Sequence, residues 1–180
     1  MLFIEGRCIL TDDQKRLMDF ISKDKDSEFP FYYYRVLDNA RAFVHCLMQR
    51  NSENEKETGV IVSEYYQFFY EIFSNFCKSQ GVVIQTVLRG AVNHSIYIPG
   101  ITCGLHVDHL FPHYNFLLYL SDCKGGDTLV YDDNGQVIKR IPPEKYKAVI
   151  FPGKPHAIDE FEPGESRLVL VFTFIGNVPN

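Results

Sequence analysis

The spacing of apolar residues divides the chain into an amino-terminal part with helical periodicity and a carboxyl-terminal part with strand-like runs. Thr11 and Gln14 have the form of a capping box, which predicts a helix that begins near Asp12. Apolar residues three and four apart predict a second helix over about residues 38–50 and a third over about residues 61–78.

From about residue 82 onwards, short runs rich in β-branched and aromatic residues are separated by Gly, Pro, Asn and Asp, as is typical of strands joined by turns. Parallel βαβ units would alternate helices with strands, so helices first and strands second predict an antiparallel sandwich or barrel. We therefore expect an α+β fold that is mainly β. The length of 180 residues and the hydrophobic content of 46% suit one domain over residues 1–180, with a mainly helical support layer over residues 1–80 and a β core over residues 81–180.

Composition narrows the class of protein. The net charge of -5 does not indicate the excess of Lys and Arg that binds a phosphate backbone, so nucleic acid is not expected as the main partner. Five scattered cysteines without a CxxC pair indicate a reducing compartment. Glu5 and Arg7 interrupt the first apolar run, and no run approaches the roughly 18 residues of a membrane span. We expect a soluble, intracellular protein of the cytoplasm.

Three of the six histidines lie within residues 106–113, beside Asp108. In a strand, residues two apart point to the same side, so His106 and Asp108 would form a chelating pair. A surface histidine beside a solvated aspartate is the alternative, and such pairs arise by chance. His156, after a strand and a Pro-Gly turn, adds a second imidazole. Two histidines and one carboxylate on a β scaffold supply the facial triad that suits iron(II) and leaves positions open for substrate and oxygen.

Arg167 begins the run RLVLVFTF, which is apolar on both faces and is therefore predicted to be a buried strand. A guanidinium in this position needs an anion or solvent. An internal carboxylate or water at the strand end would satisfy it. A bound dicarboxylic acid is the functional alternative, because the planar guanidinium group of arginine pairs with a carboxylate through two parallel hydrogen bonds.

The segments "HVD", "YNFLLYLSDCKGGDTLVY" and "FPGKPHAIDEFEPGESRLVLVF" together resemble the prolyl 4-hydroxylase type of iron(II)- and 2-oxoglutarate-dependent dioxygenases, over roughly residues 82–174. The resemblance implies a double-stranded β-helix, or jelly roll. It also implies that His106, Asp108 and His156 hold iron(II) and that Arg167 binds the far carboxylate of 2-oxoglutarate.

Further residues follow from the same resemblance. Tyr119 and Tyr97 would hydrogen-bond the co-substrate; the alternative for each is a core tyrosine with a local partner. Apart from the resemblance, His109 and His113 are clustered beside His106 and are expected in a loop at the mouth of the substrate pocket; the alternative is a role in a zinc site. Relatives that repair alkylated bases usually carry a second arginine where this chain has Thr173, which disfavours base repair.

The implied activity couples decarboxylation of 2-oxoglutarate to succinate with hydroxylation of a substrate, and O2 is the oxidant. Ascorbate is a supporting reductant, and the partner is a protein, a peptide or a small molecule, with peptidyl proline as the default. Two other functions stay open because a fold does not determine a function. A non-catalytic binding module would release no succinate, and a zinc-dependent hydrolase would hold zinc and not respond to iron.

Overall fold

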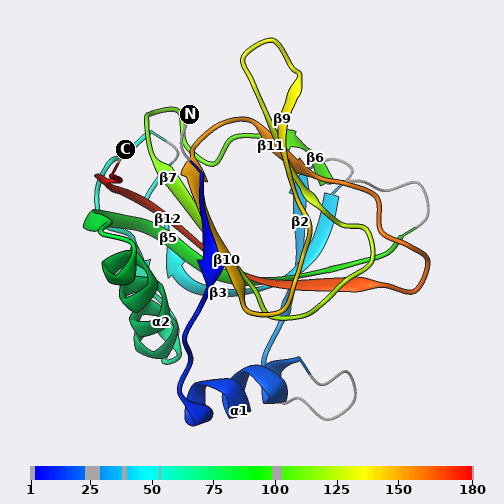
Figure 1. Ribbon diagram of the computed structural model, residues 1–180, viewed down its shortest axis with the longest axis horizontal. Coiled ribbons are helices and arrows are strands. Elements are labelled where there is room, and N and C mark those ends of the chain that lie inside the picture. Colours follow the sequence, from blue (N-terminus) through cyan, green and yellow to red (C-terminus); the bar gives the residue numbers. More distant parts are fainter. Residues whose placement is uncertain (1–2, 23–28, 38–39, 53, 99–102, 180) are drawn as a thin grey trace.

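The computed structural model describes residues 3–22, 29–37, 40–52, 54–98 and 103–179 (Figure 1). The helices are α1 (Asp12–Ile21) and α2 (Tyr66–Ser79), and the strands are β1 (Ile4–Arg7), β2 (Tyr32–Leu37), β3 (Ala40–Gln49), β4 (Val60–Ile61), β5 (Val83–Ile96), β6 (Cys103–His106), β7 (Tyr114–Tyr119), β8 (Thr128–Tyr131), β9 (Val137–Ile141), β10 (Lys147–Pro152), β11 (His156–Ile158) and β12 (Ser166–Asn177).

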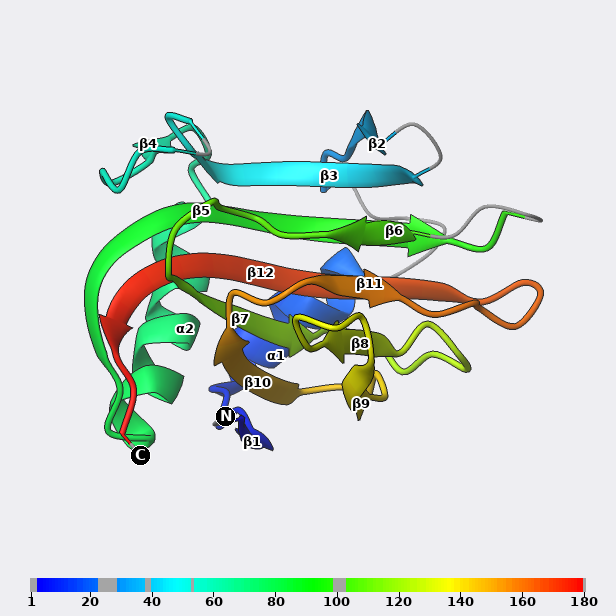
Figure 2. The same cartoon turned by 90° about the horizontal axis from the view of Figure 1, so that it is seen from above.

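The strands form two antiparallel sheets. The larger sheet has the order β1-β10-β7-β12-β5-β3-β2, with β4 beside β3, and the smaller sheet has the order β6-β11-β8-β9. From β5 to β12 the chain passes back and forth between the two sheets, which is the path of a double-stranded β-helix. The predicted mainly β fold is therefore confirmed. Figure 2 shows β6, β11 and β8 in front of β5, β12 and β7, and Figure 1 shows the two sheets opposite each other.

Both faces of the central strands β7, β10 and β12 are buried, which explains why these strands read as nearly continuous apolar runs. On the outer face, α2 packs an aromatic layer against the sheet (Figure 1). This layer contains Phe69, Phe73 and Phe76 of α2 and Phe116, Phe172 and Phe174 of the sheet. On the inner face, Leu117, Tyr119, Val169 and Val171 face the smaller sheet in a second cluster. That inner face carries the site described below.

The first and the third predicted helices are confirmed. α1 begins at Asp12 with the predicted capping box: Thr11 Oγ1 accepts from the Gln14 amide at 3.2 Å, and Gln14 Oε1 accepts from the Thr11 amide at 2.9 Å. The predicted third helix is α2, which begins a few residues later than expected because β4 pairs with β3 first. Neither helix in the described segments is long and apolar enough to cross a membrane.

The helix predicted over residues 38–50 is wrong, because this segment contains strand β3. Its apolar residues fit a helical spacing, but a short apolar run does not distinguish a buried helix from a buried strand. β3 pairs with β5 on one side and with β2 on the other, and these ladders decide its conformation. Residues 1–80 thus add four strands to the larger sheet besides the two helices. Their role as a support layer for a core that begins at residue 81 stays a prediction.

Candidate metal centre

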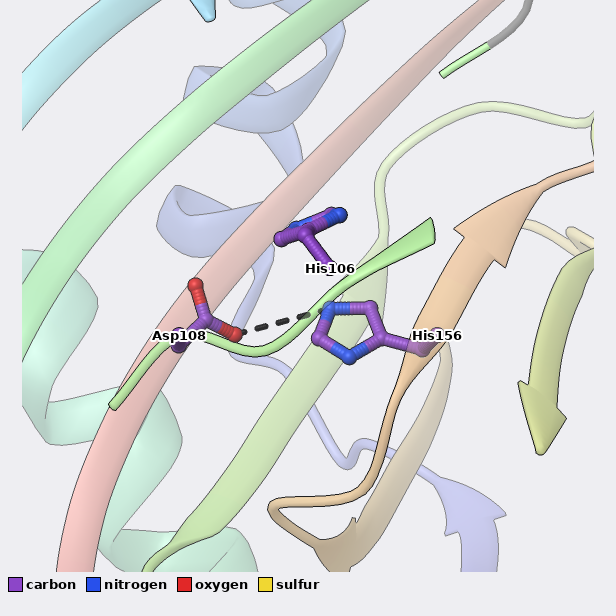
Figure 3. A group of neighbouring side chains, drawn as sticks. All are labelled: His106, Asp108 and His156. Carbon is purple, nitrogen blue, oxygen red and sulfur yellow. Dashed lines mark ion pairs between the residues drawn. The ribbon is translucent and has the colours of Figure 1, made fainter. Parts of the chain in front are cut away.

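The structure brings His106, Asp108 and His156 together between the two sheets (Figure 3). His106 is the last residue of β6, and His156 is the first residue of β11 and its direct partner in register. The two imidazole centroids are 4.4 Å apart, and His156 Nε2 lies 3.5 Å from Asp108 Oδ2. One ligand atom from each residue lies within 4.8 Å of the other two, close enough for one metal ion to bind all three.

The hydrogen bonds of His106 and His156 determine which ring nitrogen of each is available to bind a metal. His106 Nδ1 lies 3.0 Å from the carbonyl oxygen of Gly104, and His156 Nδ1 lies 2.9 Å from that of Lys154. A carbonyl oxygen only accepts, so each Nδ1 must carry the hydrogen. The Nε2 atom of each neutral imidazole therefore presents a lone pair, which is the form that binds a metal.

The charge states also suit a divalent ion. Burial raises the pKa of the Asp108 carboxyl, but His156, Arg89 and His106 together outweigh burial and lower this pKa to about 2. Burial lowers the pKa of His156 by more than the neighbouring Asp108 raises it. An ionised carboxylate and a neutral imidazole at neutral pH are the ligand forms of these side chains.

Arg167 of β12 shares a cavity of about 240 Å³ with the three side chains. It is only 2% exposed, and its Nη2 donates to Thr128 Oγ1 at 2.8 Å. The Nε and Nη1 atoms have no hydrogen-bond partner within the described part of the chain. Asp108 is the single acidic residue among the described residues that line the cavity, so the lining offers Arg167 no internal carboxylate of its own. A buried guanidinium with two unused donors fits the carboxylate of a bound dicarboxylic acid.

The two predicted tyrosines differ in position. The Tyr119 hydroxyl, fully buried, hydrogen-bonds Thr128 Oγ1 at 2.8 Å, and its ring lies beneath the Arg167 guanidinium at 5.1 Å from the centroid. Tyr97 follows the end of β5 and is not among the described residues that line the cavity. Thr128, which joins Tyr119 to Arg167, was missed in the sequence. Only the tertiary contact between β8 and β12 reveals it.

His109 and His113, which we expected at the mouth of the substrate pocket, are not among the described residues that line this cavity, and their contact with substrate stays a prediction. Each is 3% exposed, and both line a second depression of about 720 Å³ that meets the first at Val107. His109 Nε2 lies 2.8 Å from Thr173 Oγ1, and His113 packs on Gly153, where a β-carbon would come within 2.1 Å of the ring. The loop after Asp108 therefore folds its imidazoles inward.

Comparison with known proteins gives a match to one family over part of the chain. Residues 93–175 match the 2OG-Fe(II) oxygenase superfamily. No curated protein sequence matches the chain.

Three solved structures share the fold. An oxidoreductase of the 2OG-Fe(II) oxygenase family from Burkholderia pseudomallei has a TM-score of 0.73 at 12% identity, over 96% of this chain and 84% of that one. A Pseudomonas putida prolyl-4-hydroxylase has a TM-score of 0.59 at 16% identity, over 96% and 91% of the two chains. A Trichoplax adhaerens prolyl hydroxylase in complex with a hypoxia inducible factor oxygen degradation domain peptide fragment has a TM-score of 0.64 at 13% identity, over 96% and 83%.

The strand path, the His-Asp-His arrangement and the matched segment agree with one another. The chain is thus similar over residues 93–175 to the 2OG-Fe(II) oxygenase superfamily, whose enzymes use iron(II), 2-oxoglutarate and oxygen.

Proposed function

We propose that the chain is an iron(II)- and 2-oxoglutarate-dependent dioxygenase that hydroxylates peptidyl proline. One observation carries the proposal: a single cavity contains three converging metal-type donors and a buried guanidinium with two unused donors. The ion and the dicarboxylate co-substrate that these two features suit are those used by the family.

His106, Asp108 and His156 would hold the iron. With O2 as the oxidant, this ion would supply the chemistry that splits 2-oxoglutarate into succinate and CO2, with one oxygen atom of O2 entering succinate and the other the hydroxylated substrate. The protein contributes two Nε2 lone pairs whose tautomers are set by backbone carbonyls, and a carboxylate whose pKa is low enough to keep it ionised.

Arg167 would bind the far carboxylate of 2-oxoglutarate through Nε and Nη1, the two atoms without a partner in the described structure. The contact of its Nη2 with Thr128 and the Tyr119 ring beneath it fix the plane of the guanidinium. Leu117, Val169 and Val171 line the same cavity and exclude water from the reacting groups. A direct hydrogen bond from Tyr97 or Tyr119 to the co-substrate stays a prediction.

Peptidyl proline is proposed as the target because two of the structures that share the fold are prolyl hydroxylases, and one of them was solved with a peptide. The sequence resemblance to the prolyl 4-hydroxylase type supports the same target.

The test is succinate release from 2-oxoglutarate with iron(II) and ascorbate in the presence of a panel of proline-containing peptides, with mass spectrometry of the peptides. We expect succinate and a peptide that gains one oxygen atom, both absent in His106→Ala. Arg16→Gln, a change on the exposed face of α1, is the control and should behave as the wild type. Succinate release by His106→Ala at the wild-type rate would rule the mechanism out. A binding module would make no succinate, and a zinc hydrolase would retain zinc and ignore iron.

A further inference from the structure

The backbone at Asp108 is not held by a sheet. β6 ends at His106, and Asp108 lies in a bend between β6 and β7. The strand alternation used to predict the His106–Asp108 pair therefore does not apply at the carboxylate itself. His106 and His156 are fixed by their pairing in register, whereas Asp108 needs other contacts to hold it beside them.

Three side chains of the larger sheet supply such contacts. Arg50, directly after β3, donates from Nη1 to the carbonyl oxygen of Asp108 at 2.5 Å. Arg89 of β5 places Nη1 at 3.7 Å from Asp108 Oδ1. Thr173 of β12 hydrogen-bonds the next residue, His109, at 2.8 Å. The bend is thus docked on three adjacent strands, β3, β5 and β12.

Two of these side chains are direct neighbours. Arg89 pairs in register with Thr173, and Thr173 pairs on its other side with Asn115 of β7. Arg89 and Asn115 line the cavity, and Thr173 and Asn115 are almost completely buried. Buried polar side chains cost free energy unless they are bonded, so this polar row across three strands beside Asp108 suggests a purpose other than packing.

The contacts also distinguish the two oxygens of the carboxylate. Oδ1 faces Arg89. Oδ2 faces the Nε2 atom of His156, as the dashed line in Figure 3 marks. We propose that Arg89 and Thr173 are positioning residues that hold the Asp108 segment so that one carboxylate oxygen is engaged by the guanidinium and the other is left for the metal. The inference rests on the proposed function, because it assigns a role toward the same iron.

Two effects of Arg89 on the metal oppose each other. Its positive charge repels a divalent ion, and its contact with Oδ1 removes rotational freedom that the carboxylate would otherwise lose on binding. Groups that hold metal ligands in place typically change metal affinity by about 10–100-fold when they are removed. We expect orientation to outweigh repulsion, because the Arg89 side chain is 24% exposed and its charge is partly screened.

Titration with Mn(II), a redox-stable substitute for iron(II), followed through the electron paramagnetic resonance of the free ion, tests the proposal. Arg89→Gln should weaken Mn(II) binding about 10-fold or more, and Arg89→Lys, which retains the charge, should restore part of it. Thr173→Val keeps the shape and removes the hydroxyl, and should weaken binding about 3-fold. Arg16→Gln removes one cation from α1 and should leave the affinity unchanged.

Hydrogen exchange of the metal-free protein gives a second readout. Residues 106–113 should exchange faster in Arg89→Gln and in Thr173→Val, while β10 and α2 exchange as in the wild type. Mn(II) binding by Arg89→Gln that equals or exceeds that of the wild type would overturn the inference and leave the proposed function intact. A wild type that binds no Mn(II) would overturn the proposed function itself. If Arg89→Gln does not fold, Thr173→Val decides the question alone.

Discussion

The two ends of the cavity, the candidate metal site at one and Arg167 at the other, differ in how their polar groups are bonded before a ligand binds. At the metal end, each donor already has a partner: the two histidines bond backbone carbonyls through Nδ1, and Asp108 faces Arg89. At the other end, Arg167 is as buried as the core around it, yet Nε and Nη1 have no partner in the described structure. The metal end is oriented before its ligand arrives, while the Arg167 end contains a charge that only a ligand completes.

This difference indicates that the anion at Arg167 and the metal ion gain their free energy of binding from different sources. A buried charge without a counter-charge destabilises the unliganded protein, so an anion that binds Arg167 gains from relieving that penalty as well as from the hydrogen bonds. At the metal end this penalty is smaller, since each imidazole already bonds a backbone carbonyl through Nδ1 and the carboxylate faces Arg89. The gain there comes from ligands that do not have to be reoriented.

Removing a metal ligand should have the largest effect. His156→Ala leaves two of three donors, and activity should fall by more than the roughly 100-fold that follows the loss of a group supporting a ligand. Mn(II) affinity should fall in parallel, whereas the fold should persist because His156 is not part of either apolar cluster. Succinate release and Mn(II) titration measure both. A variant that keeps its Mn(II) affinity would show that His156 does not bind the metal.

Replacing Arg167 should weaken the binding of 2-oxoglutarate and leave metal binding unchanged. Arg167→Gln removes a charged partner worth about 1.5–3 kcal/mol, so the KM for 2-oxoglutarate should rise about 10–100-fold. Mn(II) affinity should remain that of the wild type. Arg140→Gln is the matched control, because it also removes one cation, from an exposed cluster with Asp127 and Asp159. Equal KM values in the two variants would contradict the assignment of Arg167.

The contrast between the two ends also explains what could be predicted from the sequence. His106, His156 and Arg167 lie on strands and were recognisable from motif spacing, whereas Asp108 was recognisable only as the third residue of the His-x-Asp motif, since it lies in a bend. The strand-rich core was recognisable from its apolar runs and turn residues. Contacts that join distant segments were not: Thr128 beside Arg167 depends on the packing of β8 on β12.

The features that the sequence did not determine have related physical causes. The segment over residues 38–50 has an apolar spacing that suits helix or strand, and only its pairing with β5 decides. The inward positions of His109 and His113 depend on how an irregular loop docks on Thr173 and Gly153, and residue spacing has no meaning outside a regular element.

A smaller effect should follow from loosening the support of Arg167. Thr128→Val removes the oxygen that bonds both Nη2 of Arg167 and the Tyr119 hydroxyl. A third guanidinium nitrogen then loses its partner, and the plane of the group is less restricted. The KM for 2-oxoglutarate should rise about 10-fold, in line with the loss of one hydrogen bond to a charged group. Steady-state kinetics at saturating peptide would measure it, and an unchanged KM would mean that Thr128 serves packing alone.

The smallest effect tests how Tyr119 acts. Tyr119→Phe removes the hydroxyl that bonds Thr128 Oγ1 and also donates to the carbonyl oxygen of Ile141. Only the bond to Thr128 bears on Arg167, and a neutral hydrogen bond is worth about 0.5–1.5 kcal/mol, so the KM for 2-oxoglutarate should rise about 3-fold. If the hydroxyl acts by orienting Thr128, its loss should have no further effect in a Thr128→Val background, because the bond between them is already gone. If it bonds the co-substrate directly, the two effects should multiply. The double-mutant cycle therefore separates a tyrosine that supports the Arg167 end from one that binds the ligand there.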